Sequence, residues 1–188
     1  MMPRLSFHSA ALICVLSLAA PTVIHGQGAA GKQPVDGVIN FTRLDATVAC
    51  AGATKAAAVP ELKQMGFASI VNLRRPSEEG ADVEGARAAA EAAGLKYFHL
   101  PFSVPETPDE NVDATIEEFL AAVGNPANQP VFIHCAGGGR AAGFWLIKRV
   151  LLDGWDVDRA RAEANVVYSD PKSPALNCAE QYAKTHRK

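Results

Sequence analysis

The chain has 188 residues and a formal net charge of −2, with a sequence pI of about 6.2. A chain of this size and composition is expected to form one domain with a substantial core. The sequence has no basic tract and no alternation of basic with aromatic residues, which argues against nucleic acid as a partner.

The first 26 residues have the pattern of a secretory signal peptide. Positive charge at Arg4 is followed by the apolar run 9–20, and small residues lead to Gly26, where cleavage would fit. The apolar run is short for a membrane span, and an uncleaved anchor is the competing interpretation. We therefore expect export to the periplasm or the medium, without stable membrane insertion after cleavage. Residues 27–37 are predicted to be a flexible linker and residues 38–188 a single catalytic domain.

Strand-like and helix-like segments alternate through the rest of the chain. Asp82, Asp156 and Ser173 are predicted to cap helices, and Thr107 begins a capping box. Strands are predicted over 40–45, 47–50, 68–73, 96–100 and 131–134. Helices are predicted over 55–65, 82–93 and 107–123, then from the glycine loop to about residue 152, and two more helices follow. The alternation predicts an α/β sandwich, with a mainly parallel central sheet of about four to five strands and helices on both faces.

The segment VFIHCAGGGRAAG, residues 131–143, is the strongest indication of function. A buried strand ends at His134 and Cys135, three glycines follow, and Arg140 precedes an apolar helix. A glycine loop at a helix N-terminus binds anions through its N–H groups, and the same environment favours a thiolate. We interpret Cys135 as a nucleophile and Arg140 as the oxyanion clamp, with the substrate-binding residues His134, Ala136, Gly137, Gly138 and Gly139 around them. The alternative is a buried cysteine that merely ends a core strand.

These residues resemble the cysteine-dependent phosphatases, in particular the bacterial dual-specificity-phosphatase-like branch that includes the beta-lactamase hydrolase-like proteins. Other similar segments are a VNLR strand at 71–74, a GAT turn at 52–54, and the stretches PELKQMGF, NLRRPSEEG and AAGLKYFHLPF. The resemblance implies a cysteine-phosphatase-like sandwich, Cys135 as phosphoryl acceptor and Arg140 as phosphate clamp. It also implies chemistry without a metal or another cofactor.

The sequence departs from the phosphatase pattern in three ways. Four residues separate Cys135 from Arg140 where the phosphatase signature usually has five. Rhodanese-type sulfurtransferases share the shorter spacing, and so does the bacterial branch that the sequence resembles. Ala141 lacks the hydroxyl group that helps the thiolate leave. A phosphatase also needs a general acid, and Glu106 and Asp109 are the candidates. Asp109 has the alternative role of a first-turn helix charge, and Glu106 that of a solvated loop residue.

Other polar residues leave alternatives open. Arg74 and Arg75 follow a strand end with Glu78 and Glu79, where they form either the rim of the pocket, with Arg74 binding substrate, or a solvated charged loop. Cys50 and Cys178 are either a disulfide of an exported protein or two unpaired thiols. The histidines show no metal-ligand spacing.

Three functions are therefore considered. The first is an exported phosphatase that acts on a phosphorylated small molecule or a phosphoprotein through a cysteinyl-phosphate intermediate. The second is a rhodanese-like sulfurtransferase with a persulfide on Cys135, and the third is an oxyanion-binding module with low activity.

Overall fold

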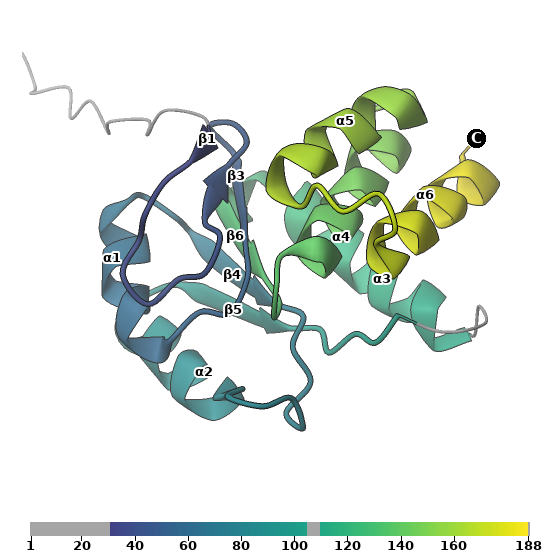
Figure 1. Ribbon diagram of the computed structural model, residues 1–188. Helices are drawn as coiled ribbons and strands as arrows, with labels where there is room; N and C mark the ends of the chain where they lie inside the picture. The colour runs from purple at the N-terminus through teal and green to yellow at the C-terminus, as the bar shows by residue number, and fades with distance from the viewer. Residues whose placement is uncertain (1–30, 105–109, 188) are drawn as a thin grey trace, which may run out of the picture.

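The computed structural model describes residues 31–104 and 110–187, which are built around one central sheet (Figure 1). Its strands lie in the order β1-β2-β3-β6-β4-β5. They are β1 (Gly31–Lys32), β2 (Thr42–Arg43), β3 (Val48–Ala51), β4 (Ser69–Asn72), β5 (Lys96–His99) and β6 (Val131–His134). The last four named pair in parallel, while β1 and β2 add an antiparallel edge. The mainly parallel sheet is confirmed, but it has six strands rather than four to five.

The additional strand comes from the segment predicted to be a linker. Gly31 and Lys32 pair with Arg43 and Thr42, and Val35 is 8% exposed. Over residues 31–37 the linker prediction is therefore wrong, because a two-residue strand and one buried valine are too short to give a periodic pattern. Residues 27–30 and the predicted signal peptide lie outside the described residues. Across 31–104 and 110–187, no helix combines the length and apolar character needed to cross a membrane.

The helices begin where the sequence places its capping residues. Asp82, Asp156 and Ser173 each accept a hydrogen bond from the backbone N–H three residues later, which confirms these three caps. Thr107 lies outside the described residues. The helices are α1 (Val59–Gln64), α2 (Val83–Ala92), α3 (Glu110–Gly124), α4 (Gly139–Leu151), α5 (Val157–Val167) and α6 (Pro174–His186), with 3-10 turns at Ala56–Ala58 and Pro126–Asn128.

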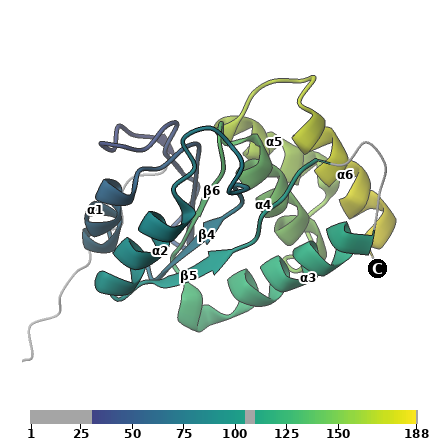
Figure 2. The same cartoon turned by 90° about the horizontal axis from the view of Figure 1, so that it is seen from below.

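The helices cover both faces of the sheet, as predicted (Figures 1 and 2). Successive side chains of a strand point to opposite faces, so Val131 and Ile133 of β6 pack in the cluster with α3 to α6. Phe132, between them, packs on the other side in the cluster with α1 and α2. Because β6 is buried on both faces, its carboxyl end is held firmly in the middle of the sheet.

Aromatic side chains fix β6 and α4 on the two faces. On one face the ring centroid of Phe132 lies 6.0 Å from Phe41 and 5.6 Å from Phe67. On the other face Phe144 of α4 meets Phe102 edge-on at 4.8 Å and Phe119 at 5.0 Å. Removing one such buried ring typically costs about 3–5 kcal/mol of stability. The connection from β6 to α4 is thus anchored at both of its ends.

Candidate active site

Cys135 lies at the carboxyl end of β6, immediately before the loop that leads into α4. Gly138, the N-cap of α4, has a φ of +108°, a backbone conformation that side chains rarely adopt and that glycine tolerates. The thiol is only 2% exposed, yet it lines a pocket of about 710 Å³ at the surface. A strand end, a glycine turn and a helix N-terminus therefore meet at this sulfur atom.

The loop is fixed from its outer side by its carbonyl groups. Ala136 O accepts a hydrogen bond from the Ala53 N–H at 2.7 Å, and Gly137 O accepts one from Asn40 Nδ2 at 3.3 Å. Since C=O and N–H point in opposite directions across a trans peptide, the N–H groups of Gly137 and Gly138 are directed to the inside of the loop. Gly138 N–H accordingly donates to Cys135 Sγ at 3.1 Å. The loop thus presents amide donors to the sulfur.

Close approach of the segment after β3 makes this arrangement possible. A Cβ on Gly52 would lie 2.8 Å from Ala136 O and 3.2 Å from the carbonyl carbon of Gly137. Both neighbours are backbone atoms of the active-site loop, so a side chain at position 52 would displace the loop. The GAT turn noted in the sequence therefore supports the loop from behind.

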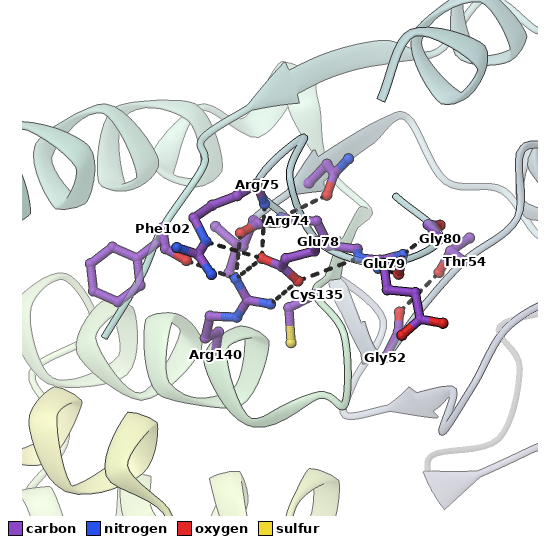
Figure 3. Close-up of polar contacts among 12 residues, drawn as sticks. Gly52, Thr54, Arg74, Arg75, Glu78, Glu79, Gly80, Phe102, Cys135 and Arg140 are labelled. Atoms are coloured by element: carbon purple, nitrogen blue, oxygen red, sulfur yellow. Dashed lines mark hydrogen bonds and ion pairs between the residues drawn. The ribbon is translucent and has the colours of Figure 1, made fainter. Parts of the chain in front are cut away.

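Arg140 joins three segments of the chain above Cys135 (Figure 3). Its Nη1 donates to Leu73 O at 3.0 Å and to Phe102 O at 2.7 Å. The two nitrogens Nη1 and Nη2 also bind the two carboxylate oxygens of Glu78, each at 2.7 Å. Arg140 also interacts with Cys135 and lines the same pocket. Burial lowers the pKa of Arg140, but its hydrogen bonds and charge interactions with Glu78 and Cys135 together raise it above the usual value.

Glu78 is the partner that orients this guanidinium. Hydrogen bonding to Arg140 is the main cause that lowers the pKa of Glu78 from 4.5 to about 2. The backbone N–H of Arg75 donates to Glu78 Oε1 at 2.9 Å, and Arg74 Nε lies 3.5 Å from Oε2. Glu78 is therefore a fixed carboxylate, with no proton to give at neutral pH. The sequence placed Glu78 either at the rim of the pocket or in a solvated charged loop, and Glu78 does line the pocket. No local pattern connects it to Arg140.

The pocket is bounded by segments from four parts of the chain. Its remaining walls are Arg75, Ser103, Val104, Tyr168, Ser173, Pro174 and Ala175. The Tyr168 ring lies over the loop, 3.3 Å from where a Cβ on Gly139 would be and 3.7 Å from one on Gly137. The two candidate acids, Glu106 and Asp109, lie outside the described residues. In the sequence they come two and five residues after Val104, which lines the pocket together with Ser103.

Comparison with known proteins agrees with this geometry. Residues 40–152 match the family model of the phosphatase-like domain of the beta-lactamase hydrolase-like proteins. The chain belongs to this family. It is 32% identical over 111 residues to the beta-lactamase hydrolase-like protein of Agrobacterium fabrum, a match that covers 58% of the chain and 25% of that protein. The match thus spans about a quarter of the length of that relative.

Solved cysteine phosphatases share the fold of this phosphatase-like domain. TpbA of P. aeruginosa, crystallised in complex with phosphotyrosine, has a TM-score of 0.61 at 22% identity, with 84% of this chain and 91% of that chain covered. The core catalytic domain of the PP-IP phosphatase Siw14 from S. cerevisiae has a TM-score of 0.62 at 22% identity, with coverage of 81% and 88%. The predicted phosphatase-type fold is confirmed.

Arg74 lies outside the pocket of this phosphatase-like domain. Its side chain is buried and donates to Glu79 O at 2.5 Å and to Gly80 O at 3.0 Å. It lines a separate cavity of about 570 Å³. The guanidinium therefore holds its own loop together, and the geometry gives it no contact with a ligand beside Cys135. Arg75, with a half-exposed side chain, lines the pocket in its place.

His134 lies beneath the active-site loop and is not among the residues that line the pocket. It is 3% exposed, its ring stacks on Phe132 at 5.7 Å, and its Nδ1 has no hydrogen-bond partner among the described residues. Burial, followed by the charges of Arg74 and Arg140, lowers its pKa to about 3. A neutral, buried ring is suited to packing rather than to contact with substrate.

The three described cysteines are unpaired thiols, including Cys50 and Cys178. The disulfide considered from the sequence is therefore not formed in this structure. Cys50 is buried on β3, with its Sγ 3.7 Å from Ala141 O at the start of α4. Within 31–104 and 110–187, no three His, Cys, Asp or Glu side chains gather as a metal site would require.

Proposed function

We propose that this phosphatase-like domain is a cysteine-dependent phosphatase that hydrolyses phosphomonoesters. One observation carries the proposal: Cys135 Sγ accepts the Gly138 N–H at 3.1 Å and lines the same pocket as Arg140. Amide donors beside a sulfur stabilise the thiolate, and a guanidinium next to it matches phosphate oxygens. The nucleophile and the anion-binding donors thus lie at one point of the surface.

The loop and α4 would hold the transferred phosphoryl group. The N–H of Gly137 points inward, and the first N–H groups of α4 have no acceptor within the helix. Arg140 lines the same pocket and interacts with Cys135. These donors are fixed before the substrate binds, so they need little reorganisation as negative charge develops on the phosphoryl oxygens.

Catalysis would then proceed in two displacements. Cys135 Sγ attacks phosphorus, and the S–P bond forms as the P–O bond of the ester breaks. The leaving oxygen takes a proton from a carboxylic acid. Water next attacks phosphorus and gives its proton to the resulting carboxylate, and the S–P bond breaks to release phosphate and thiolate. Glu78, with a pKa of about 2, cannot supply the first proton. Glu106 and Asp109 remain our candidates for this acid.

The substrate class is proposed to be that of a protein tyrosine or dual-specificity phosphatase, a phosphoprotein or a phosphorylated small molecule. The phosphotyrosine complex of TpbA and the PP-IP activity of Siw14 support this range. Ala141, which follows Arg140, offers no hydroxyl to assist departure of the thiolate. We therefore expect weak turnover, with the second displacement as the slow step.

We also propose that the protein is exported, on the strength of residues 1–26. Fractionation of its host cells should place the protein in the periplasm or the medium, with a processed N-terminus close to residue 27. A cytoplasmic protein that retains residues 1–26 would refute this part of the proposal.

The reaction is tested with purified protein and the Cys135→Ser variant on two substrates, an aryl phosphate and thiosulfate with cyanide. Phosphate release by the parent protein should fall at least about a thousandfold in the variant, because serine is a much weaker nucleophile. Thiocyanate formation without phosphate release would instead establish the sulfurtransferase. Inactivity on both substrates, with measurable binding of phosphate, would establish the oxyanion-binding module.

A further inference from the structure

Asn40 has a strained backbone and a side chain directed at the active-site loop. It lies just before β2, far from Cys135 in the sequence, and has a φ of +54°. No other residue except glycine has a positive φ in the described part of the chain. Asparagine tolerates this conformation better than most residues, but a strained position usually persists because its surroundings require it.

The side-chain amide of Asn40 bridges the active-site loop and the end of α5. Its Nδ2 donates to Gly137 O at 3.3 Å in the loop and to Val167 O at 2.8 Å at the end of α5. Approach to the loop is close, since a Cβ on Gly138 would lie 2.8 Å from this nitrogen. Tyr168, the next residue after Val167, lines the pocket. Asn40 thus ties the loop to the segment that carries Tyr168.

The bond to Gly137 O determines where the next N–H points. That carbonyl belongs to the peptide whose nitrogen is the N of Gly138, and the Gly138 N–H donates to Cys135 Sγ at 3.1 Å. The hydrogen bond from Asn40 that fixes Gly137 O on the outer side of the loop therefore also keeps the Gly138 N–H directed at Cys135 Sγ. A hydrogen bond to a charged acceptor is stronger than one to a neutral acceptor, so its loss alters the ionisation of a thiol.

We infer that Asn40 is a positioning residue, which keeps the Gly138 amide aimed at Cys135 and so maintains the thiolate. The effect of Asn40 on turnover rests on the proposed phosphatase function, whereas its effect on the reactivity of the Cys135 thiol does not. Asn40→Gly leaves the titratable or charged groups near Cys135 in place, namely Cys50 and the pocket residues Arg75, Glu78, Arg140 and Tyr168. Asn40→Asp adds one carboxylate to them.

The test measures how fast iodoacetamide alkylates Cys135 across a range of pH, with the modified peptide quantified by mass spectrometry. Asn40→Gly removes the amide but accepts a positive φ without strain, so it separates the hydrogen bond from the backbone conformation. Asn40→Asp keeps the shape and replaces the donor with an acceptor. Both variants should move the midpoint of the alkylation profile upward by about one pH unit, the shift that a bond of this strength supports.

The matched control is Asn125→Gly. Asn125 Oδ1 accepts a hydrogen bond from the Ala127 N–H at 2.9 Å, before the opposite end of β6. This variant loses a comparable side chain to backbone bond, and its alkylation profile should not move. Thermal unfolding of each protein confirms that the alkylated molecules are folded.

An unchanged midpoint in folded Asn40→Gly would overturn the inference, and an unchanged midpoint in folded Asn40→Asp would do so as well. An equal shift in Asn125→Gly would also overturn it, since the effect would then be general. The thiol readout needs no turnover. Absence of phosphatase activity in the parent protein would therefore defeat the proposed function while leaving the role of Asn40 to be decided by alkylation.

Discussion

Two arginines stand at the same edge of the sheet, and only one of them faces the pocket. Arg74 follows β4 and donates to two carbonyl groups of its own loop, Glu79 O and Gly80 O. Arg140 follows β6, donates to carbonyl groups of two other segments and lines the pocket together with Cys135. Both contact Glu78. An arginine that follows a strand end is therefore not always part of the pocket. Arg74 uses its donors on its own loop, whereas Arg140 donates to other segments and lines the pocket.

The largest effect that separates the two arginines is expected from replacing each with lysine. Arg140→Lys loses the fork that binds Glu78 and that we propose binds phosphate, so kcat/KM for an aryl phosphate should fall about a hundredfold or more. Arg74→Lys should change kcat/KM less than about tenfold but lower the free energy of unfolding by about 1–3 kcal/mol. Steady-state kinetics and urea unfolding measure the two quantities. Equal losses of kcat/KM in both variants would refute the distinction.

A smaller effect is expected from Glu78→Gln, which removes the charge that both arginines share. The guanidinium of Arg140 would keep only neutral hydrogen bonds, so kcat/KM should fall about tenfold as Arg140 loses its orientation. An unchanged kcat/KM would show that the carboxylate does not position Arg140.

Glu78 should also contribute to stability in a defined pH range. Its folded pKa of about 2 lies below the usual 4.5, so its stabilisation is complete above pH 4.5 and is lost as the pH falls toward 2. The free energy of unfolding, measured by denaturant titration at each pH, should decline across this range in the parent protein. The decline should be shallower in Glu78→Gln, and parallel curves for the two proteins would contradict the pairing.

The smallest effect concerns His134, which we place in the core rather than in the pocket. Its folded pKa of about 3 lies below the usual 6.5, so the unfolded chain takes up the proton first as the pH falls. The free energy of unfolding should therefore decrease from pH 6.5 down to 3, and this slope should be shallower in His134→Gln. His186→Gln, at an exposed site near the C-terminus, is the matched control. A slope unaffected by His134→Gln would argue that the ring is not buried neutral.

The sequence predicted the features that depend on neighbouring residues. Cys135, the glycines and Arg140 lie within one short stretch, and the caps at Asp82, Asp156 and Ser173 act over three residues. Glu78 and Asn40 show no such signal, because they reach the loop across sequence separations of 62 and 97 residues. His134 adjoins Cys135 in the sequence, but strand alternation turns its side chain to the opposite face from Cys135. The roles of Glu78, Asn40 and His134 therefore depend on long-range packing, which local sequence patterns do not reveal.

The most direct test of the account is to quench the protein in acid during turnover of an aryl phosphate and to locate the covalent phosphate by mass spectrometry. We predict phosphate on the peptide that contains Cys135, at a level that rises as the second displacement slows. No phosphate should be found in Cys135→Ser. Steady phosphate release with no phosphate on Cys135, or with phosphate on another residue, would contradict the account.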